Sequence, residues 1–355
     1  MNGRLIINAF LLTGSLFAAS VLGAFVLGGS AHAQFGLPGG TDLSITSAPE
    51  YPAPNSSVRL SLRSVFLDLS ASTITWYAND AVVAEGVGIS ETNIVAPPLG
   101  SETRVRVEVG GQDGNFVATG VIRPTEIDLL WEADSYVPPF YRGRALPSPG
   151  SSVRLFAVPR FQRPGTQSSV PPDELIYTWK KNNRIIQAAG GRGKHTVTME
   201  SPVLFGADTI SVEARTADGV LRGFASVRIA SVEPTLSLYM NHPVFGILYH
   251  QALTKESVIP ETEVVFTAVP YFAPTRSPDS SQLIYDWSIN TTEIGSDPEH
   301  PSSITINAEG SSGLAQIELA LTHATNFFIS SFGTWNITLS GIGSANIPDP
   351  FGAQP

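Results

Sequence analysis

The chain has 355 residues, of which 42% are hydrophobic and 15% charged, with a formal net charge of −10 and no cysteine. This length suits two or three domains better than one compact sandwich. The acidic balance argues against nucleic acid as a partner. Without cysteine the chain has no disulfide, no thiolate for catalysis or zinc, and no acylated lipoprotein anchor.

The N-terminus carries an export signal. Residues 5–28 are almost all apolar or small, and Arg4 precedes them. Residues 30–33 read Ser-Ala-His-Ala, a small-residue cleavage pattern, so we predict a signal peptide over residues 1–33 that is cut between Ala33 and Gln34. The alternative is a retained membrane anchor, because ~20 apolar residues are enough to cross a bilayer. In either case we expect the rest of the chain outside the cytoplasm, secreted or at the cell surface.

Three tryptophans recur at the length of one β-sandwich domain. Trp76, Trp179 and Trp287 each end an apolar strand-like segment, and their spacings are 103 and 108 residues. A sandwich of about 100 residues often buries one tryptophan between its sheets. We therefore predict that these three residues are structural core residues of three similar domains in a row.

The flanking sequence repeats with the tryptophans. Residues 104–109 alternate between charged residues and valine, as a half-buried strand requires, and Asp-Gly pairs at 113–114 and 218–219 predict hairpin turns. Pro124 and Pro234 mark short linkers, which favour a semi-rigid row. The predicted domains are residues 34–125, 126–231 and 232–345, followed by a flexible tail over 346–355.

Residues 76–86 resemble the Trp-Tyr-x-Asn-Gly-x-x-Val segment of bacterial immunoglobulin-like and PKD-like domains, and residues 179–186 are similar. Asp80 and Asn183 replace the turn glycine, and both tolerate the left-handed conformation. The third unit departs after Trp287, where residues 290–292 lack the second apolar strand. The resemblance covers roughly residues 41–340. It implies an all-β fold of three tandem immunoglobulin-like sandwiches in an exported envelope protein, with no shared catalytic residues.

A looser likeness connects residues 130–146 and 173–179 to multi-domain envelope proteins, some of which are found with pilus or surface-appendage components. It implies that the partners are other envelope or appendage proteins.

Candidate chemistry is sparse. The chain has no G-x-S-x-G turn for a nucleophilic serine, and the histidines after residue 33 have no metal-ligand spacing. Glu293, Asp297 and Glu299 form an acidic cluster, which suits either solvated loops or a calcium ion between domains. We predict no catalytic, cofactor or metal site and expect that the protein is not an enzyme.

Six aromatic residues lie in Pro-rich segments outside the alternating strands: Tyr136, Phe140, Tyr141, Tyr249, Tyr271 and Phe272. Side chains of this kind either pack onto sandwich edges and domain joints or contact a glycan or a protein. Charge is also uneven. Residues 126–230 contain 13 basic and 10 acidic side chains, whereas residues 231–355 contain two basic and 12 acidic ones. This difference is either surface drift between repeats or a head-to-tail attraction within or between molecules.

These patterns predict a non-catalytic structural or interaction protein of the cell envelope, acting as a multi-domain spacer or as part of a surface assembly such as a pilus. The alternative is a surface adhesin or carbohydrate-binding protein whose partners are surface glycans. No nucleic-acid partner is expected, and contact with the membrane is expected only through an uncleaved N-terminal segment.

Overall fold

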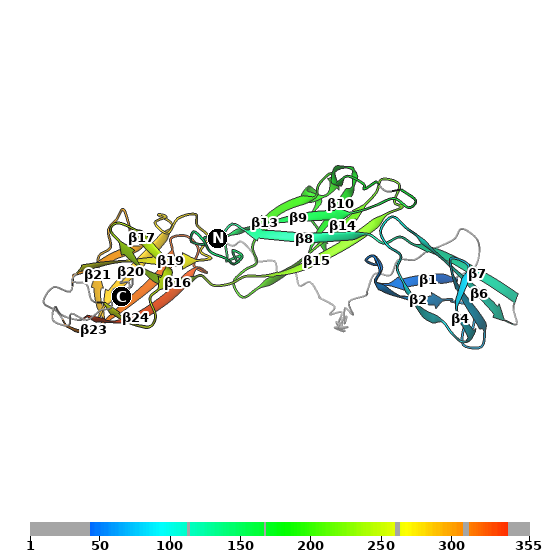
Figure 1. The fold of residues 1–355 in the computed structure, drawn as a ribbon, viewed down its shortest axis with the longest axis horizontal. Helices are drawn as coiled ribbons and strands as arrows, with labels where there is room; N and C mark the ends of the chain where they lie inside the picture. Colours follow the sequence, from blue (N-terminus) through cyan, green and yellow to red (C-terminus); the bar gives the residue numbers. More distant parts are fainter. Residues whose placement is uncertain (1–42, 112–113, 167, 260–262, 308–311, 340–355) are drawn as a thin grey trace, which may run out of the picture.

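The computed structural model describes residues 43–111, 114–166, 168–259, 263–307 and 312–339. The described residues form strands and two short 3-10 helices, and none of these helices is long and apolar enough to cross a membrane. The strands pair into six sheets, two for each of three domains. The first (blue to cyan), second (green) and third (yellow to orange) domains lie in a row in Figure 1.

The first domain is a seven-stranded antiparallel sandwich. One sheet has the order β1-β2-β5, and the other has the order β4-β3-β6-β7. The strands are β1 (Ser44–Ala48), β2 (Ser57–Arg63), β3 (Thr73–Ala78), β4 (Ala81–Val87), β5 (Glu91–Val95), β6 (Thr103–Gly111) and β7 (Gly114–Ile122). These sheets have the three-plus-four division of an immunoglobulin-like sandwich.

The second domain repeats this plan. Its sheets have the orders β13-β9-β8 and β11-β10-β14-β15, and β12 also pairs with β10. The elements are β8 (Glu126–Ala133), β9 (Ser152–Arg160), η1 (Pro172–Glu174), β10 (Ile176–Lys181), β11 (Arg184–Ile185), η2 (Gln187–Ala189), β12 (Gly191–Arg192), β13 (Thr196–Glu200), β14 (Ala207–Arg215) and β15 (Arg222–Ala230).

The third domain is the most elaborate. Its sheets have the orders β17-β16-β19-β22 and β18-β24-β23-β20-β21. The strands are β16 (Thr235–His242), β17 (Gly246–Ala252), β18 (Glu256–Ile259), β19 (Glu263–Tyr271), β20 (Leu283–Ile289), β21 (Thr292–Ile294), β22 (Ser303–Asn307), β23 (Gly313–His323) and β24 (Ser330–Leu339). Where the sequence indicated no second apolar strand after Trp287, the structure has the three-residue strand β21. β18 pairs with β24 in parallel.

Each domain has a core built around one tryptophan. Trp76, Trp179 and Trp287 are buried between the two sheets of their domains. A buried indole needs a hydrogen-bond acceptor for its N–H. The three N–H groups donate to the carbonyls of Ile89 (2.8 Å), Lys194 (2.8 Å) and Pro301 (3.0 Å), each on the chain that crosses to the opposite sheet.

An asparagine three residues after each tryptophan fixes the following hairpin. Asn182 shows the arrangement: its N–H donates to the carbonyl of Thr209 (2.8 Å), and its Oδ1 accepts the N–H of Thr209 (2.9 Å). Asn79 and Asn290 make the same two bonds to Arg104 and Gln316. The two turn residues are left-handed in all three hairpins, at Asn79–Asp80, Asn182–Asn183 and Asn290–Thr291. This is the turn that matches the twist of paired strands.

Candidate functional site at the domain joints

The residues predicted from the sequence do not converge on a surface site. The three tryptophans lie inside separate cores, and Ala33 and Gln34 lie outside the described residues. No group of three or more His, Asp or Glu side chains in the described ranges is placed to hold a metal ion. In the acidic cluster, Oδ1 of Asp297 accepts the N–H of Glu299 at 2.9 Å and so caps a turn of its own loop.

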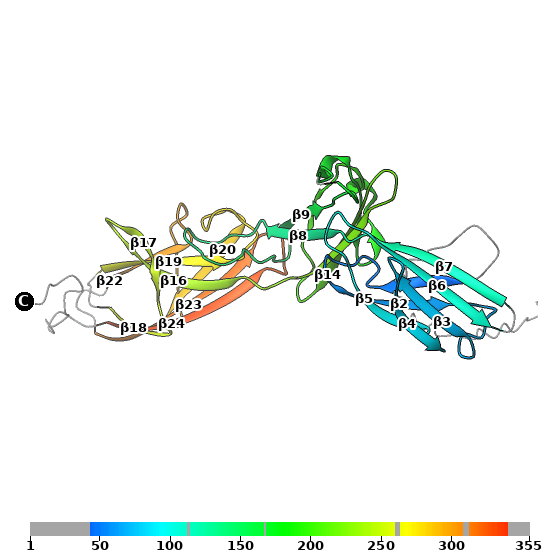
Figure 2. The ribbon, with the colours of Figure 1, turned by 45° about the vertical axis from the view of Figure 1, so that its right-hand side comes forward.

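The joint between the second and third domains is closed by a segment of the second domain, residues 134–151, which connects β8 to β9. The N–H of Tyr136 donates to the carbonyl of Ala273 (2.8 Å), and the carbonyl of Tyr136 accepts the N–H of Phe272 (2.7 Å). We call this segment the clasp. Figures 1 and 2 both show it leaving β8 toward the end of the third domain that faces the second. Prolines at 138, 139, 147 and 149 prevent this segment from forming a helix or a regular β-strand.

Five of the six predicted aromatic residues gather at this joint. The ring of Tyr141 on the clasp meets Tyr271 and Phe272 at centroid distances of 5.7 and 6.1 Å. Burial raises the pKa of Tyr136 above its ordinary value of 10, and its interaction with Tyr249 raises it further. Phe140 is the exception, with 93% of its surface exposed. Most of these aromatic side chains therefore pack into a domain joint, one of the two roles that the sequence left open.

A second contact lies beside the clasp. Nδ2 of Asn326, in the loop between β23 and β24, donates to the carbonyl of Pro149 at 3.0 Å. Gly150, at φ +86°, makes room for it, because a Cβ there would lie 2.7 Å from Nδ2 of Asn326. The ion pair across this joint joins Asp134 of the second domain to Arg276 of the third at 3.9 Å. Here the second domain supplies the acidic partner and the third the basic one, the reverse of an attraction between a basic second and an acidic third domain. Exposed ion pairs of this kind contribute little to stability.

The joint between the first and second domains has fewer direct bonds. Oγ1 of Thr125 donates to the carbonyl of Arg222 (2.5 Å), and the N–H of Gly165 donates to the carbonyl of Gly100 (3.0 Å). The rings of Tyr51 and Phe224 stack across the joint at 6.5 Å. Among the described residues, no segment like the clasp and no group of three or more aromatic rings connects these two domains.

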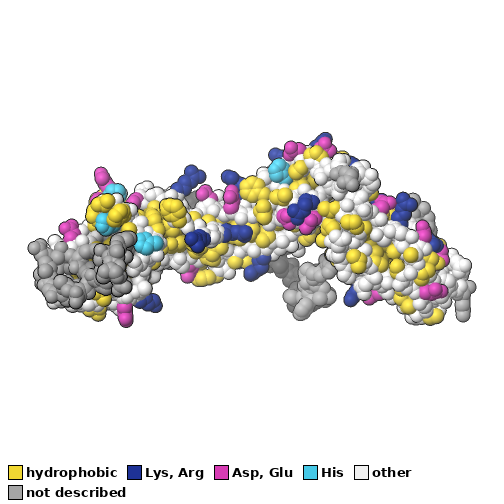
Figure 3. All heavy atoms as spheres, in the orientation of Figure 1, with side chains coloured by type: hydrophobic (Ala, Val, Ile, Leu, Met, Phe, Trp, Pro, Cys, Tyr) yellow, Lys and Arg dark blue, Asp and Glu magenta, His cyan; other side chains and the backbone are white. Residues whose placement is uncertain are grey.

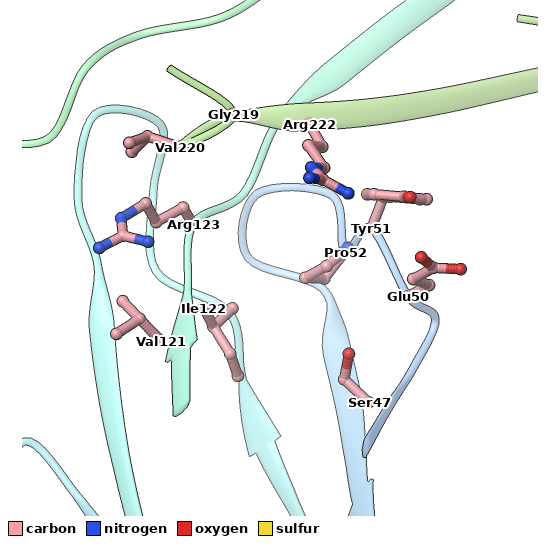
Figure 4. Close-up of a pocket in the computed structure, with 10 residues that line it drawn as sticks. All are labelled: Ser47, Glu50, Tyr51, Pro52, Val121, Ile122, Arg123, Gly219, Val220 and Arg222. Atoms are coloured by element: carbon pink, nitrogen blue, oxygen red, sulfur yellow. The ribbon is translucent and has the colours of Figure 1, made fainter. Parts of the chain in front are cut away.

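A cavity of about 340 Å³ opens at this first joint. Figure 4 shows the guanidinium of Arg222 beside Tyr51 on one side and Arg123 on the other. Arg123 is paired with Glu102 at 3.0 Å. Burial raises the pKa of Tyr51, and its hydrogen bond with Glu50 raises it further. The cavity therefore presents an aromatic ring with both donors and acceptors. Nothing in the local sequence marked Tyr51 or Arg222, because their proximity arises only when two domains meet.

The surface between the joints is mixed in charge. On the face drawn in Figure 3, basic and acidic side chains are interspersed along the row. The ion pairs of the second domain include Arg160 with Glu126 (2.9 Å) and Lys181 with Asp208 (2.7 Å). A field of one sign, which would steer a highly charged partner, does not cover this face.

No family model and no curated protein matches the sequence. Among solved structures, the three N-terminal domains of the outer capsid protein Hoc of bacteriophage RB49 have a TM-score of 0.25 and 13% identity, covering 88% of this chain and 100% of theirs. The central fibronectin-III array of RIM-binding protein has a TM-score of 0.28 and 14% identity, covering 88% and 98%. Fibronectin(III)-like modules of Clostridium thermocellum CbhA have a TM-score of 0.21 and 14% identity, covering 62% and 100%.

These TM-scores are too low to support an inference about this chain, so its class rests on the strand pairings. The described residues form a tandem array of three immunoglobulin-like β-sandwich domains.

Proposed function

We propose that this protein is a non-catalytic, exported spacer of the cell envelope, which holds a binding surface at a fixed distance or forms part of a surface assembly such as a pilus. The clasp is the observation that carries this proposal. A joint that relied only on a linker would leave the domains free to reorient, which is the default for small polar interfaces. Here the chain devotes residues 134–151 to fixing that joint.

The clasp restrains bending in two ways. The two backbone bonds of Tyr136, to the carbonyl of Ala273 and from the N–H of Phe272, tie the second domain to the third. The Tyr141 ring packs against Tyr271 and Phe272 beside these bonds. Bending the joint must break both contacts together and expose aromatic surface to water. The second and third domains are therefore expected to move as one body, with the first joint as the more compliant one.

Export and location rest on the sequence, since residues 1–33 lie outside the described residues. The proposed role is tested by cross-linking native cells and analysing the N-terminus and linked partners by mass spectrometry. A start at Gln34 with reproducible links to appendage or surface-layer subunits supports a structural component. Links only to cytoplasmic proteins would contradict the proposal.

The cavity at the first joint favours a second candidate function, binding of a neutral glycan. Sugar hydroxyls both donate and accept hydrogen bonds, and aromatic rings stack on sugar faces, so Tyr51, Glu50 and Arg222 suit them. A glycan array tests this candidate with the unmodified chain, Tyr51→Ala and the control Tyr77→Ala on the outer face of β3. Glycan binding that Tyr51→Ala abolishes and Tyr77→Ala preserves would support a role as an adhesin. If the unmodified chain binds no glycan, this candidate function is excluded.

A further inference from the structure

The outer edge of β7 presents backbone groups that have no partner among the described residues. β7 is the last strand of its sheet and pairs with β6 from Gly114 to Ile122. Arg104 on β6 exchanges its N–H and carbonyl bonds with Asn79, on the far side from β7. Val121, the β7 residue opposite Arg104, therefore directs its own N–H and carbonyl outward.

Since the direction alternates along a strand, the same holds for Asn115, Val117 and Thr119. Among the described residues, these four outward-facing positions have no backbone hydrogen-bond partner on that side. Val117 is 46% exposed. Val121, at the other end of the edge, is partly buried and borders the cavity of about 340 Å³ that Tyr51 and the second domain also line.

The other long edge strands of the described structure carry features that discourage pairing. Charged side chains, bulges and covering segments are the usual protection of an exposed edge. β15 has the same length as β7 and carries Arg222 and Arg228. β4 contains Glu85, and its pairing is interrupted by a register shift at Trp76/Tyr77. β7 reads Gly-Asn-Phe-Val-Ala-Thr-Gly-Val-Ile, with no charge, no proline and no bulge.

The third domain shows that this edge can accept a strand. β24 is the counterpart of β7. In the first domain the order from the tryptophan strand outward is β3-β6-β7, and in the third it is β20-β23-β24. Four residues of β18 pair with its outer edge, Glu256 to Ile259 against Asn336 to Leu339. The described part of the first domain has no strand equivalent to β18.

We propose that β7 pairs antiparallel with β7 of a second copy, joining two first domains through one continuous sheet about a two-fold axis at Ala118. This goes beyond the proposed function and does not depend on the identity of any envelope partner. In this register Val117 lies opposite Thr119 of the second copy, and Asn115 lies opposite Val121. Both pairs consist of outward-facing residues, as the hydrogen-bonded pairs of an antiparallel ladder require.

The side chains fit the same register. Phe116 lies opposite Gly120 of the second copy, so a large ring meets a residue without a side chain. On the solvent face, Glu108 of β6 flanks Val117, and Arg106 flanks Thr119. A line drawn across the four strands of the paired sheets therefore passes from Glu108 through Val117 of one copy to Thr119 and Arg106 of the other. Opposite charges, not like charges, stand at its two ends. β7 has no charged side chain that could pair with a charged peptide. An uncharged strand such as β7 of a second copy therefore suits this edge better.

Sedimentation velocity of residues 34–355 over a range of concentrations tests the proposal. We expect a monomer–dimer equilibrium. Thr119→Pro removes an outward N–H without removing a bond to β6, and the two-fold axis repeats that loss in both copies. The association constant should fall at least about tenfold.

The matched control is Ser226→Pro on β15. On β14, the N–H and carbonyl of Thr209 both bond to Asn182 and so point away from β15. Arg228 is the residue of β15 opposite Thr209, so its N–H and carbonyl point outward from the sheet, and the same holds two residues earlier at Ser226. This variant should leave the association constant unchanged. Amide exchange gives the register: Val117 and Thr119 should gain protection with rising concentration, while Phe116 and Ala118 stay protected throughout. A monomer at all concentrations, or an association constant that Thr119→Pro leaves unchanged, would overturn the proposal.

Discussion

The N–H of Tyr136 in the second domain donates to the carbonyl of Ala273 in the third at 2.8 Å. The carbonyl of Tyr136 accepts a second bond, from the N–H of the adjacent residue Phe272 at 2.7 Å. Both backbone groups of Tyr136 are therefore bonded to the third domain. At the first joint, the contacts among the described residues include two hydrogen bonds, at Thr125 and Gly165, and the stack of Tyr51 on Phe224.

Removal of one clasp ring should loosen the joint without unfolding a domain. Tyr141→Ala deletes the ring that contacts Tyr271 and Phe272, whereas Phe140→Ala deletes a neighbouring ring that is 93% exposed. Residual dipolar couplings should fit one alignment tensor for the second and third domains in the unmodified chain and in Phe140→Ala. Tyr141→Ala should need two tensors. A single tensor for Tyr141→Ala would mean that the ring does not restrain the joint.

The core role of Trp179 predicts a large loss on truncation. Trp179→Ala leaves a cavity between the sheets and an unpaired carbonyl at Lys194, so the second domain should lose about 3–5 kcal/mol of unfolding free energy. Trp131→Ala, at a partly buried residue of the same domain, should cost clearly less. Urea denaturation followed by far-UV circular dichroism measures both, and equal losses would refute the assignment of Trp179 as the centre of this core.

The asparagine turns predict opposite outcomes for two adjacent residues. Asn182→Ala removes the Oδ1 acceptor for Thr209 and places alanine at φ +49°, which should destabilise the domain by about 1–2 kcal/mol. Asn183→Gly replaces a left-handed residue at φ +64° by the residue that tolerates this conformation best, so the change should stay within about 0.5 kcal/mol. Thermal unfolding of the two variants distinguishes them, and similar losses would show that the side-chain bond contributes little.

His323 should make the loop beside the clasp sensitive to acid. Burial lowers the pKa of His323 below its ordinary 6.5, and its Nδ1 accepts the N–H groups of Thr325 (3.2 Å) and Asn326 (3.1 Å). Because the folded-state pKa is the lower one, this stabilisation is fully present above about pH 6.5 and is lost as the pH falls through the folded-state pKa.

Amide exchange at Asn326 should therefore accelerate on acidification beyond the intrinsic effect of pH. His323→Asn keeps an acceptor that does not titrate in this range, so its protection should not change with pH. An identical pH profile for both proteins would exclude His323 as the cause.

The sequence predicted the fold class because local patterns determine it. The alternation in residues 104–109 places Val105, Val107 and Val109 in the core, and the three tryptophans are buried as their spacing indicated. The left-handed turns at Asp80 and Asn183 also follow from the residues present. These features depend on neighbours within one hairpin or one domain.

Contacts between domains were harder to predict. The segment containing Tyr136 and Tyr141 was recognisable as unusual, but its partner, the end of β19, lies about 130 residues further along the chain and has no complementary sequence pattern. The cavity residues Tyr51 and Arg222 are ordinary in their own strands and loops. Such positions depend on how whole domains dock, which local periodicity does not encode.

The absence of cysteine makes one measurement direct. Thr198→Cys on β13 and Thr305→Cys on β22 place two labels on exposed positions of the second and third domains. Pulsed electron–electron distance measurement on this double variant should give a single narrow distribution, and Tyr141→Ala should broaden it. A broad distribution in the unmodified background would contradict the central claim that the clasp makes these two domains one rigid body.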